Sequence, residues 1–139
     1  MTTKVLTTAA RMIALALLIF ACAACSGTTN EQPGAVVEKY FQAIVDGDED
    51  EVATLSCADW ETSARADVAA FYGVKARLEN VACQPTQTGE STGADSVVIE
   101  CSGAIIATYN NEDATFELTG KLFNVVNQGG EWLVCGYAQ

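Results

Sequence analysis

The 139-residue sequence contains no histidine. That absence removes the Ser-His-Asp and Cys-His catalytic pairs, histidine-ligated zinc and a histidine general base. Positive charge is also scarce, because seven Lys and Arg residues stand against 18 Asp and Glu, a net charge of −11. A chain without a basic stripe cannot neutralise phosphates, so we expect no nucleic-acid binding. The sequence also lacks a glycine-rich phosphate loop and a run of apolar residues long enough to span a bilayer.

The first 24 residues predict an export signal. Lys4 and Arg11 provide positive charge, the apolar stretch 12–20 follows, and small residues lead to Cys25. The run Ala23-Ala24-Cys25 resembles the lipobox of bacterial lipoproteins, in which a cysteine that follows small residues is lipidated and becomes the mature N-terminus. Cys22 stands where that motif usually has leucine, which is a departure. Lipidation at Cys22 and ordinary secretory cleavage are the two alternatives.

Lipidation at Cys25 divides the chain into a signal peptide (1–24), a polar tether (25–33) and a domain (34–139). Four cysteines then remain, and an even number is expected of an exported, oxidised domain. The mature part has five basic and 18 acidic residues, a charge of −13, and such a surface repels anionic headgroups. We therefore expect membrane contact through the lipid alone. The predicted location is the outer face of the cell membrane or the periplasm.

The domain begins with helical patterns and continues with strand patterns. Apolar residues at three- and four-residue steps predict helices, and alternation between Gly- and Asn-rich turns predicts strands. Helices are expected over 34–46, 49–56 and 59–72, and strands over 74–83, 96–109, 114–126 and 131–138. Helices followed by strands with short connections indicate an α+β fold with a four-stranded antiparallel sheet.

The order of these patterns carries a family resemblance. The first helix ends in Asp46-Gly47-Asp48, and the last strand begins with Gly-Gly-Glu-Trp-Leu-Val over 129–134. The chain resembles the cystatin-like superfamily of nuclear transport factor 2, scytalone dehydratase and ketosteroid isomerase, in particular its small bacterial lipoproteins. The resemblance implies helices in the concavity of a curved sheet, often around a cone-shaped pocket. It implies no single activity, because members include enzymes, binders and assembly modules.

The four remaining cysteines predict two disulfides. A turn near residue 92 places Cys83 opposite Cys101, and Cys57 is then the partner of Cys135, whose side chain we expect to point toward the helices with Leu133 and Tyr137. The other two sets of pairs remain open from the sequence. None of these four cysteines has C-x-x-C spacing, so neither a metal site nor a cofactor is expected in the domain.

The acidic run at the first helix junction has the spacing of a calcium loop. Asp46, Asp48 and Asp50 occupy its positions 1, 3 and 5. Position 6 is Glu51 rather than glycine, and position 12 is Cys57 rather than glutamate, so the loop geometry is not met. We interpret the run as a solvated junction in which Asp48 caps the second helix.

Aromatic residues are the candidates for the lining of a pocket. They are Tyr40, Trp60, Phe71, Tyr109, Phe116 and Tyr137. Asp59 and Asp67 lie on the third predicted helix. The related isomerases stabilise an enolate with a tyrosine and a protonated aspartate, but no motif here fixes such a set. The amphipathic pattern favours an aromatic core with two surface acids.

One face of the predicted sheet bears apolar residues that point away from the helices. Ile106, Phe123 and Val125 are expected to be exposed there and to form an interface with a second copy or with an envelope protein. The sequence thus predicts a non-enzymatic envelope lipoprotein that binds a small ligand or a protein. The alternative is a pocket enzyme of the dehydratase, isomerase or cyclase type.

Overall fold

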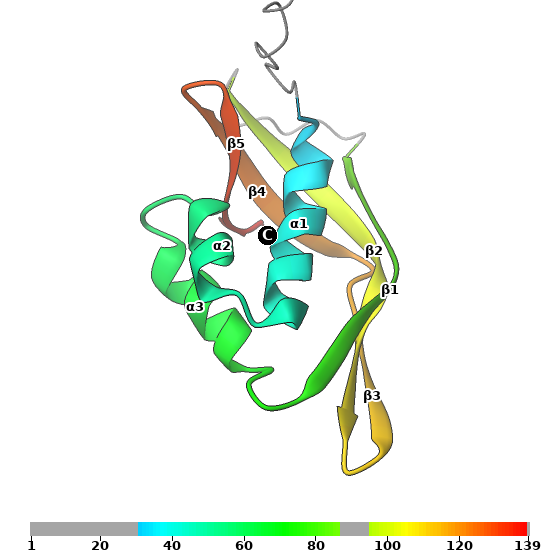
Figure 1. The fold of residues 1–139 in the computed structure, drawn as a ribbon. Coiled ribbons are helices and arrows are strands. Elements are labelled where there is room, and N and C mark those ends of the chain that lie inside the picture. The colour runs from blue at the N-terminus through cyan, green and yellow to red at the C-terminus, as the bar shows by residue number, and fades with distance from the viewer. Residues whose placement is uncertain (1–30, 87–94, 139) are drawn as a thin grey trace, which may run out of the picture. The chain divides into compact units, whose positions relative to one another are not determined.

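The computed structural model describes residues 31–86 and 95–138. The predicted signal peptide, Cys25 and most of the tether lie outside the described residues. The described chain forms three helices followed by five strands (Figure 1). The helices pack on one face of an antiparallel sheet, which is the predicted α+β class with one more strand than expected.

Local sequence signals set the ends of the first two helices. Helix α1 (Pro33–Asp46) begins with proline in its first turn and ends at Gly47, whose φ of 74° suits glycine. Helix α2 (Glu49–Thr54) is capped by Asp48, whose side chain accepts a hydrogen bond of 2.9 Å from the backbone N–H of Glu51. Helix α3 (Glu61–Ala69) is shorter at both ends than the pattern predicts.

The sheet is built around one long strand. The strands are β1 (Lys75–Pro85), β2 (Ser96–Tyr109), β3 (Glu112–Glu117), β4 (Lys121–Gln128) and β5 (Glu131–Tyr137), in the order β1-β2-β4-β5 with β3 also paired to β2. Strand β1 contains a bulge between Glu79 and Ala82. The first part of β2 pairs with β4 and its second part pairs with β3, so β3 and β4 follow one another along the same side of β2.

A turn separates β3 from β4, where the sequence predicts one continuous strand. Gly120 adopts a φ of 79°, and the N–H of Lys121 donates to the carbonyl of Leu118 at 2.9 Å. The turn changes which residues of the pattern face the helices. Phe116 and Leu118 face inward before it, whereas Phe123 and Val125 face inward after it.

The expectation that Phe123 and Val125 are exposed is therefore wrong. Phe123 is 1% exposed and Val125 is fully buried. The ring of Phe123 packs edge-on against Phe41 of α1 with centroids 5.2 Å apart. These side chains belong to the core between helices and sheet, together with the other fully buried large residues Tyr40, Ile99, Val37, Val52 and Val134.

Ile106 lies on the outer face as predicted, but it is only 5% exposed. It sits in β2 between Arg77 of β1 and Thr115 of β3. The guanidinium of Arg77 reaches across β2 to Asp113 of β3 at 3.1 Å. Because Arg77 is the direct neighbour of Ile106 and its guanidinium reaches Asp113 beyond it, we infer that the aliphatic part of Arg77 covers Ile106. The predicted apolar interface on this face is consequently absent from the described residues.

The connection between α2 and α3 lies along the outer edge of β5. Ser56 forms a parallel bridge with Val134. The N–H of Cys57 donates to the carbonyl of Val134 at 2.9 Å, and the N–H of Val134 donates to the carbonyl of Leu55 at 2.9 Å. These bonds cover the edge that β5 would otherwise expose. No helix in the described residues is both long and apolar enough to cross a membrane.

Candidate functional site

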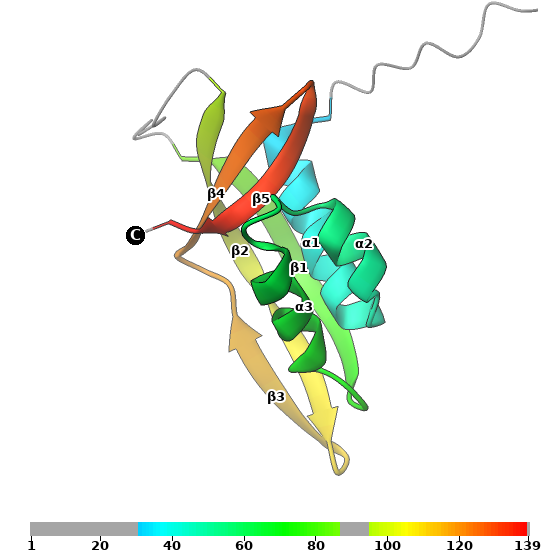
Figure 2. The ribbon, with the colours of Figure 1, turned by 90° about the vertical axis from the view of Figure 1, so that its left-hand side faces the viewer.

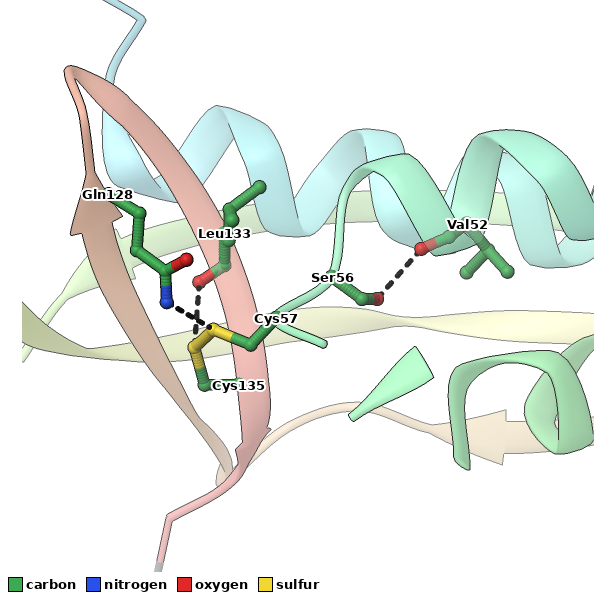
Figure 3. The surroundings of a disulfide bond; sticks show 6 residues. All are labelled: Val52, Ser56, Cys57, Gln128, Leu133 and Cys135. Carbon is green, nitrogen blue, oxygen red and sulfur yellow. Dashed lines mark hydrogen bonds between the residues drawn. A yellow bond between two sulfur atoms is a disulfide. The ribbon is translucent and has the colours of Figure 1, made fainter. Parts of the chain in front are cut away.

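The disulfide between Cys57 and Cys135 joins the start of the α2–α3 connection to β5 (Figure 3). The Gln128 amide donates to Cys57 Sγ at 3.4 Å, and Cys135 Sγ lies 3.6 Å from the carbonyl oxygen of Leu133. Ser56 Oγ donates to the carbonyl of Val52 at 2.7 Å, which fixes the end of α2 beside the disulfide.

The register around this disulfide differs from the predicted one. The turn is centred on Gly129 and Gly130, so Val125 pairs with Val134, and an irregularity follows before Phe123 pairs with Tyr137. Val134 is fully buried in the core, where the sequence suggested Leu133. The irregularity allows both Val134 and Tyr137 to face the helices.

The second disulfide joins Cys83 of β1 to Cys101 of β2, which are direct partners in the sheet register. Helix α1 lies against this position. Glu38 accepts a hydrogen bond of 2.9 Å from the backbone N–H of Cys83, and a Cβ on Gly34 would overlap the Cys83 carbonyl. The sequence favoured these same two pairs: the hairpin register predicted Cys83–Cys101, and Cys57–Cys135 followed as the remaining pair.

Three of the predicted aromatic residues meet around one carboxylate. The hydroxyls of Tyr40 and Tyr137 donate to the same oxygen of Asp67, at 2.8 and 3.2 Å. The indole N–H of Trp60 donates to the Tyr40 hydroxyl at 3.2 Å. The cluster joins α1, α3 and the last strand, with Trp60 at the start of α3.

Burial and the carboxylate act on the two phenols in the same direction. Burial raises the pKa of Tyr40 far above its ordinary value, and the hydrogen bond to Asp67 raises it further. Burial is also the main cause that raises the pKa of Tyr137 to about 12, followed by the negative charge of Asp67. Both phenols therefore remain protonated at neutral pH and act as hydrogen-bond donors.

This geometry favours a structural role for the cluster. Each phenol commits its proton to Asp67, and Tyr40 also accepts the Trp60 N–H. Among the described residues, no buried side-chain nitrogen or oxygen lacks a hydrogen-bond partner. A satisfied network of this kind holds the helices and the last strand in one arrangement.

The other predicted pocket residues lie elsewhere. Phe71, which follows α3, and Phe116 of β3 pack edge-on with centroids 5.5 Å apart. Tyr109 is 39% exposed at the end of β2, away from the cluster. The six aromatic residues therefore do not line one pocket. The space in which the resemblance implies a cone-shaped pocket is occupied around Phe41 and Phe123.

Two hollows described in the structure lie on the surface. One, of about 260 Å³, adjoins the Cys83–Cys101 disulfide, and its lining includes Gln84, Glu100 and Ser102. The other, of about 440 Å³, lies at the α1–α2 junction beside Asp46, Asp48, Asp50 and the exposed Tyr72. Within the described part of the chain, no three side chains are placed to hold a metal ion together.

Two features were missed from the sequence. Asp67 was noted as an acid, but nothing in the sequence indicates that it joins Tyr40 and Tyr137, which lie 27 and 70 residues away. The separate edge strand β3 was merged with β4. Its signal was Leu118-Thr119-Gly120, where apolar alternation is broken by a glycine.

Comparisons with known proteins identify no family. No protein-family model matches the chain, and no curated protein matches it. Among solved structures, the chain is similar to a SEC-C motif containing protein from Rhodopseudomonas palustris, at 9% identity and a TM-score of 0.49. That alignment covers 76% of this chain and 78% of the other. A likeness this distant says nothing about function, and the cystatin-like resemblance stays a prediction.

Proposed function

We propose that the protein is an exported lipoprotein whose domain is a non-enzymatic binding module. The observation that carries the proposal is the pairing of cysteines. All four cysteines of the domain form disulfides, which are typical of oxidising compartments. Cys22 and Cys25 lie outside these pairs, and Cys25, which directly follows the predicted signal peptide, is the one we expect to carry the lipid.

A binding role is supported by the interior of the domain. Buried apolar side chains pack between helices and sheet, and the Tyr40–Asp67–Tyr137 cluster is internally satisfied. A pocket enzyme needs a cavity that admits substrate to its polar groups. The packing around the cluster therefore supports a role through the surface of the domain.

Lipidation is tested by substitution of Cys25 in a lipoprotein-processing bacterium. The Cys25→Ala variant should lose incorporation of labelled palmitate and leave the membrane fraction, while Cys22→Ala, the matched control, should retain both. Membrane association and labelling of Cys25→Ala at the wild-type level would refute the lipid anchor. If instead Cys22→Ala alone lost the label, the lipid would belong on Cys22.

The second candidate, a pocket enzyme, is favoured by one observation. Two tyrosine hydroxyls donate to a single oxygen of the Asp67 carboxylate at the helix–sheet boundary. The neutral dye Nile red tests whether an apolar molecule can reach this cluster. The binding-module proposal predicts no saturable fluorescence increase with the folded protein. Saturable binding that Asp67→Asn weakens, in a variant that remains folded, would favour the enzyme.

A further inference from the structure

Strands β4 and β3 pair with the first and second halves of β2, and the sheet continues beyond only one of them in the described residues. Past β4 the sheet continues with β5, whereas past β3 the described residues supply no further strand. Figure 2 shows β3 with its outer edge open and the β2–β3 hairpin extending past the helices. The sheet therefore has an open position beside β3 that one strand of about six residues would fill, since β3 has six residues.

The backbone groups that line this open edge can be identified. The N–H of Leu118 donates to the carbonyl of Gly103 at 2.9 Å, and the β2–β3 register continues from there without a shift. Because hydrogen-bonded and non-hydrogen-bonded pairs alternate along an antiparallel ladder, Ala114 and Phe116 bond to β2. The N–H and C=O groups of Asp113, Thr115 and Glu117 then point outward, toward the open position.

Apolar side chains adjoin the same edge. Phe116 is 43% exposed and Tyr137, at the end of β5, is 51% exposed. Tyr137 bonds to Asp67, and Phe116 packs against Phe71. Asp67 lies in the last turn of α3 and Phe71 lies in the turn that follows the helix, so the C-terminal end of α3 and this turn contact both aromatic residues. An added strand could pack apolar side chains against these rings on its inner face.

The charge on β3 selects the occupant. Glu112, Asp113 and Glu117 make three acids among six residues, with no basic residue. Asp113 is engaged by Arg77, whereas Glu112 and Glu117 are exposed and take part in none of the ion pairs described. A second copy paired antiparallel about Thr115, so that the outward groups meet, would place Asp113 opposite Glu117, and like charges directly opposite are destabilising. A positively charged segment meets no such repulsion.

We propose that the open edge of β3 binds an extended, basic segment of a partner protein as an additional strand. Backbone bonds to residues 113, 115 and 117 supply the pairing, Phe116 supplies the apolar contact, and Glu112 and Glu117 supply the charge selectivity. The proposal rests on the proposed function, because it names the partner chemistry of a surface binding module.

The probe is the peptide Lys-Val-Lys-Val-Lys-Val-Lys, titrated calorimetrically into the lipidated protein in phosphatidylcholine nanodiscs, with empty nanodiscs as the blank. Wild type should bind the peptide and should not bind the peptide in which glutamate replaces lysine. Thr115→Pro should weaken binding by about tenfold, the loss of one hydrogen bond, because it removes an outward N–H. Thr115→Ala is the matched control and should bind as wild type.

Thr115→Pro should fold, because its missing N–H faces away from β2 and proline is tolerated at such edge positions. The urea midpoint of each variant checks this. The double variant Glu112→Gln/Glu117→Gln leaves the backbone unchanged and should weaken binding while reducing its salt dependence. A peptide N-methylated at all of its residues, which cannot complete the ladder in either strand direction, should also bind more weakly.

Three results would overturn the proposal. The first is that Thr115→Pro and Thr115→Ala bind the peptide with equal affinity. The second is that N-methylation of the peptide leaves its affinity unchanged. The third is that wild type sediments as a dimer and Thr115→Pro sediments as a monomer. The last would make a second copy the occupant. If wild type fails to bind the peptide but is palmitoylated at Cys25 and excludes Nile red, the β3 site is wrong and the proposed function stands.

Discussion

Replacing both cysteines of the Cys57–Cys135 pair by alanine should destabilise the domain more than the same change at Cys83 and Cys101. The first pair closes 78 residues and the second 18. Chain-entropy loss grows with the logarithm of loop length, which gives about 4.5 kcal/mol for the long loop and about 3.2 kcal/mol for the short one. Because the short loop lies inside the long one, its disulfide reduces the effective long loop to about 60 residues and its contribution to about 4.3 kcal/mol.

The backbone hydrogen bonds around Cys57 should survive the substitution, although the bond from Gln128 to the sulfur is lost. The hydrogen bonds of Cys57 and Leu55 to Val134 use backbone atoms, and Ser56 bonds to Val52 without either sulfur. The loss of stability should therefore arise chiefly from greater freedom of the unfolded chain. An unfolded state with fewer cross-links also exposes more surface, so the urea m-value should rise.

The assay is urea unfolding followed by tryptophan fluorescence, with the remaining disulfide kept oxidised in each variant. The difference between the two pairs should be about 1 kcal/mol in the free energy of unfolding, with the 57/135 variant less stable. A larger loss from the 83/101 variant would refute the loop-length reasoning. It would show that the contact of α1 with Cys83, through Gly34 and Glu38, is what that disulfide maintains.

Two further predictions concern the core and the tyrosine cluster. Phe123→Ala should lower the free energy of unfolding by about 3–5 kcal/mol, because its ring is buried against Phe41. Phe116→Ala, the half-exposed control, should lower it far less. Thermal melts compare the two variants, and equal losses of stability would contradict the assignment of Phe123 to the inner face. The raised pKa of Tyr137, about 12, means that the folded domain keeps a proton that the unfolded chain releases above about pH 10. The free energy of unfolding should be constant below that pH and should fall as the pH rises toward 12. Urea midpoints measured across this range should fall less steeply with pH in Tyr137→Phe than in wild type. The same slope in both proteins would exclude Tyr137 as the cause.

The sequence predicted those features that depend on neighbours along the chain. Pro33, Gly47 and Asp48 set helix ends through local hydrogen bonds and φ preferences, so α1 and α2 were found nearly to the residue. The Cys83–Cys101 pair was found because a single hairpin, counted from its turn, fixes the register of two neighbouring strands. The order of helices and strands, and with it the α+β fold, followed from the apolar periodicity and the short connections between strands.

The errors arose where two strands were joined by an unrecognised turn. With Gly120 taken as an interior strand residue, alternation carried Leu122 inward and Phe123 outward. Omission of this one short turn therefore reversed the predicted faces of β4 and merged β3 with β4 in the prediction. The Asp67 cluster could not be predicted, because its bonds depend on how α3 packs against α1 and β5.

The nested order of the disulfides bears on how the domain acquires its native cysteine pairs. A chain that emerges N-terminus first and is oxidised as it appears presents Cys57 and Cys83 before the other two cysteines. Joining cysteines in order of emergence would give 57–83 and 101–135, neither of which is a native pair. The native pairs therefore require that β1 and β2 find each other before Cys57 reacts, or that a disulfide isomerase corrects the early product. The last strand then acts as the closing step, because Cys135 reaches Cys57 only after the whole sheet is present.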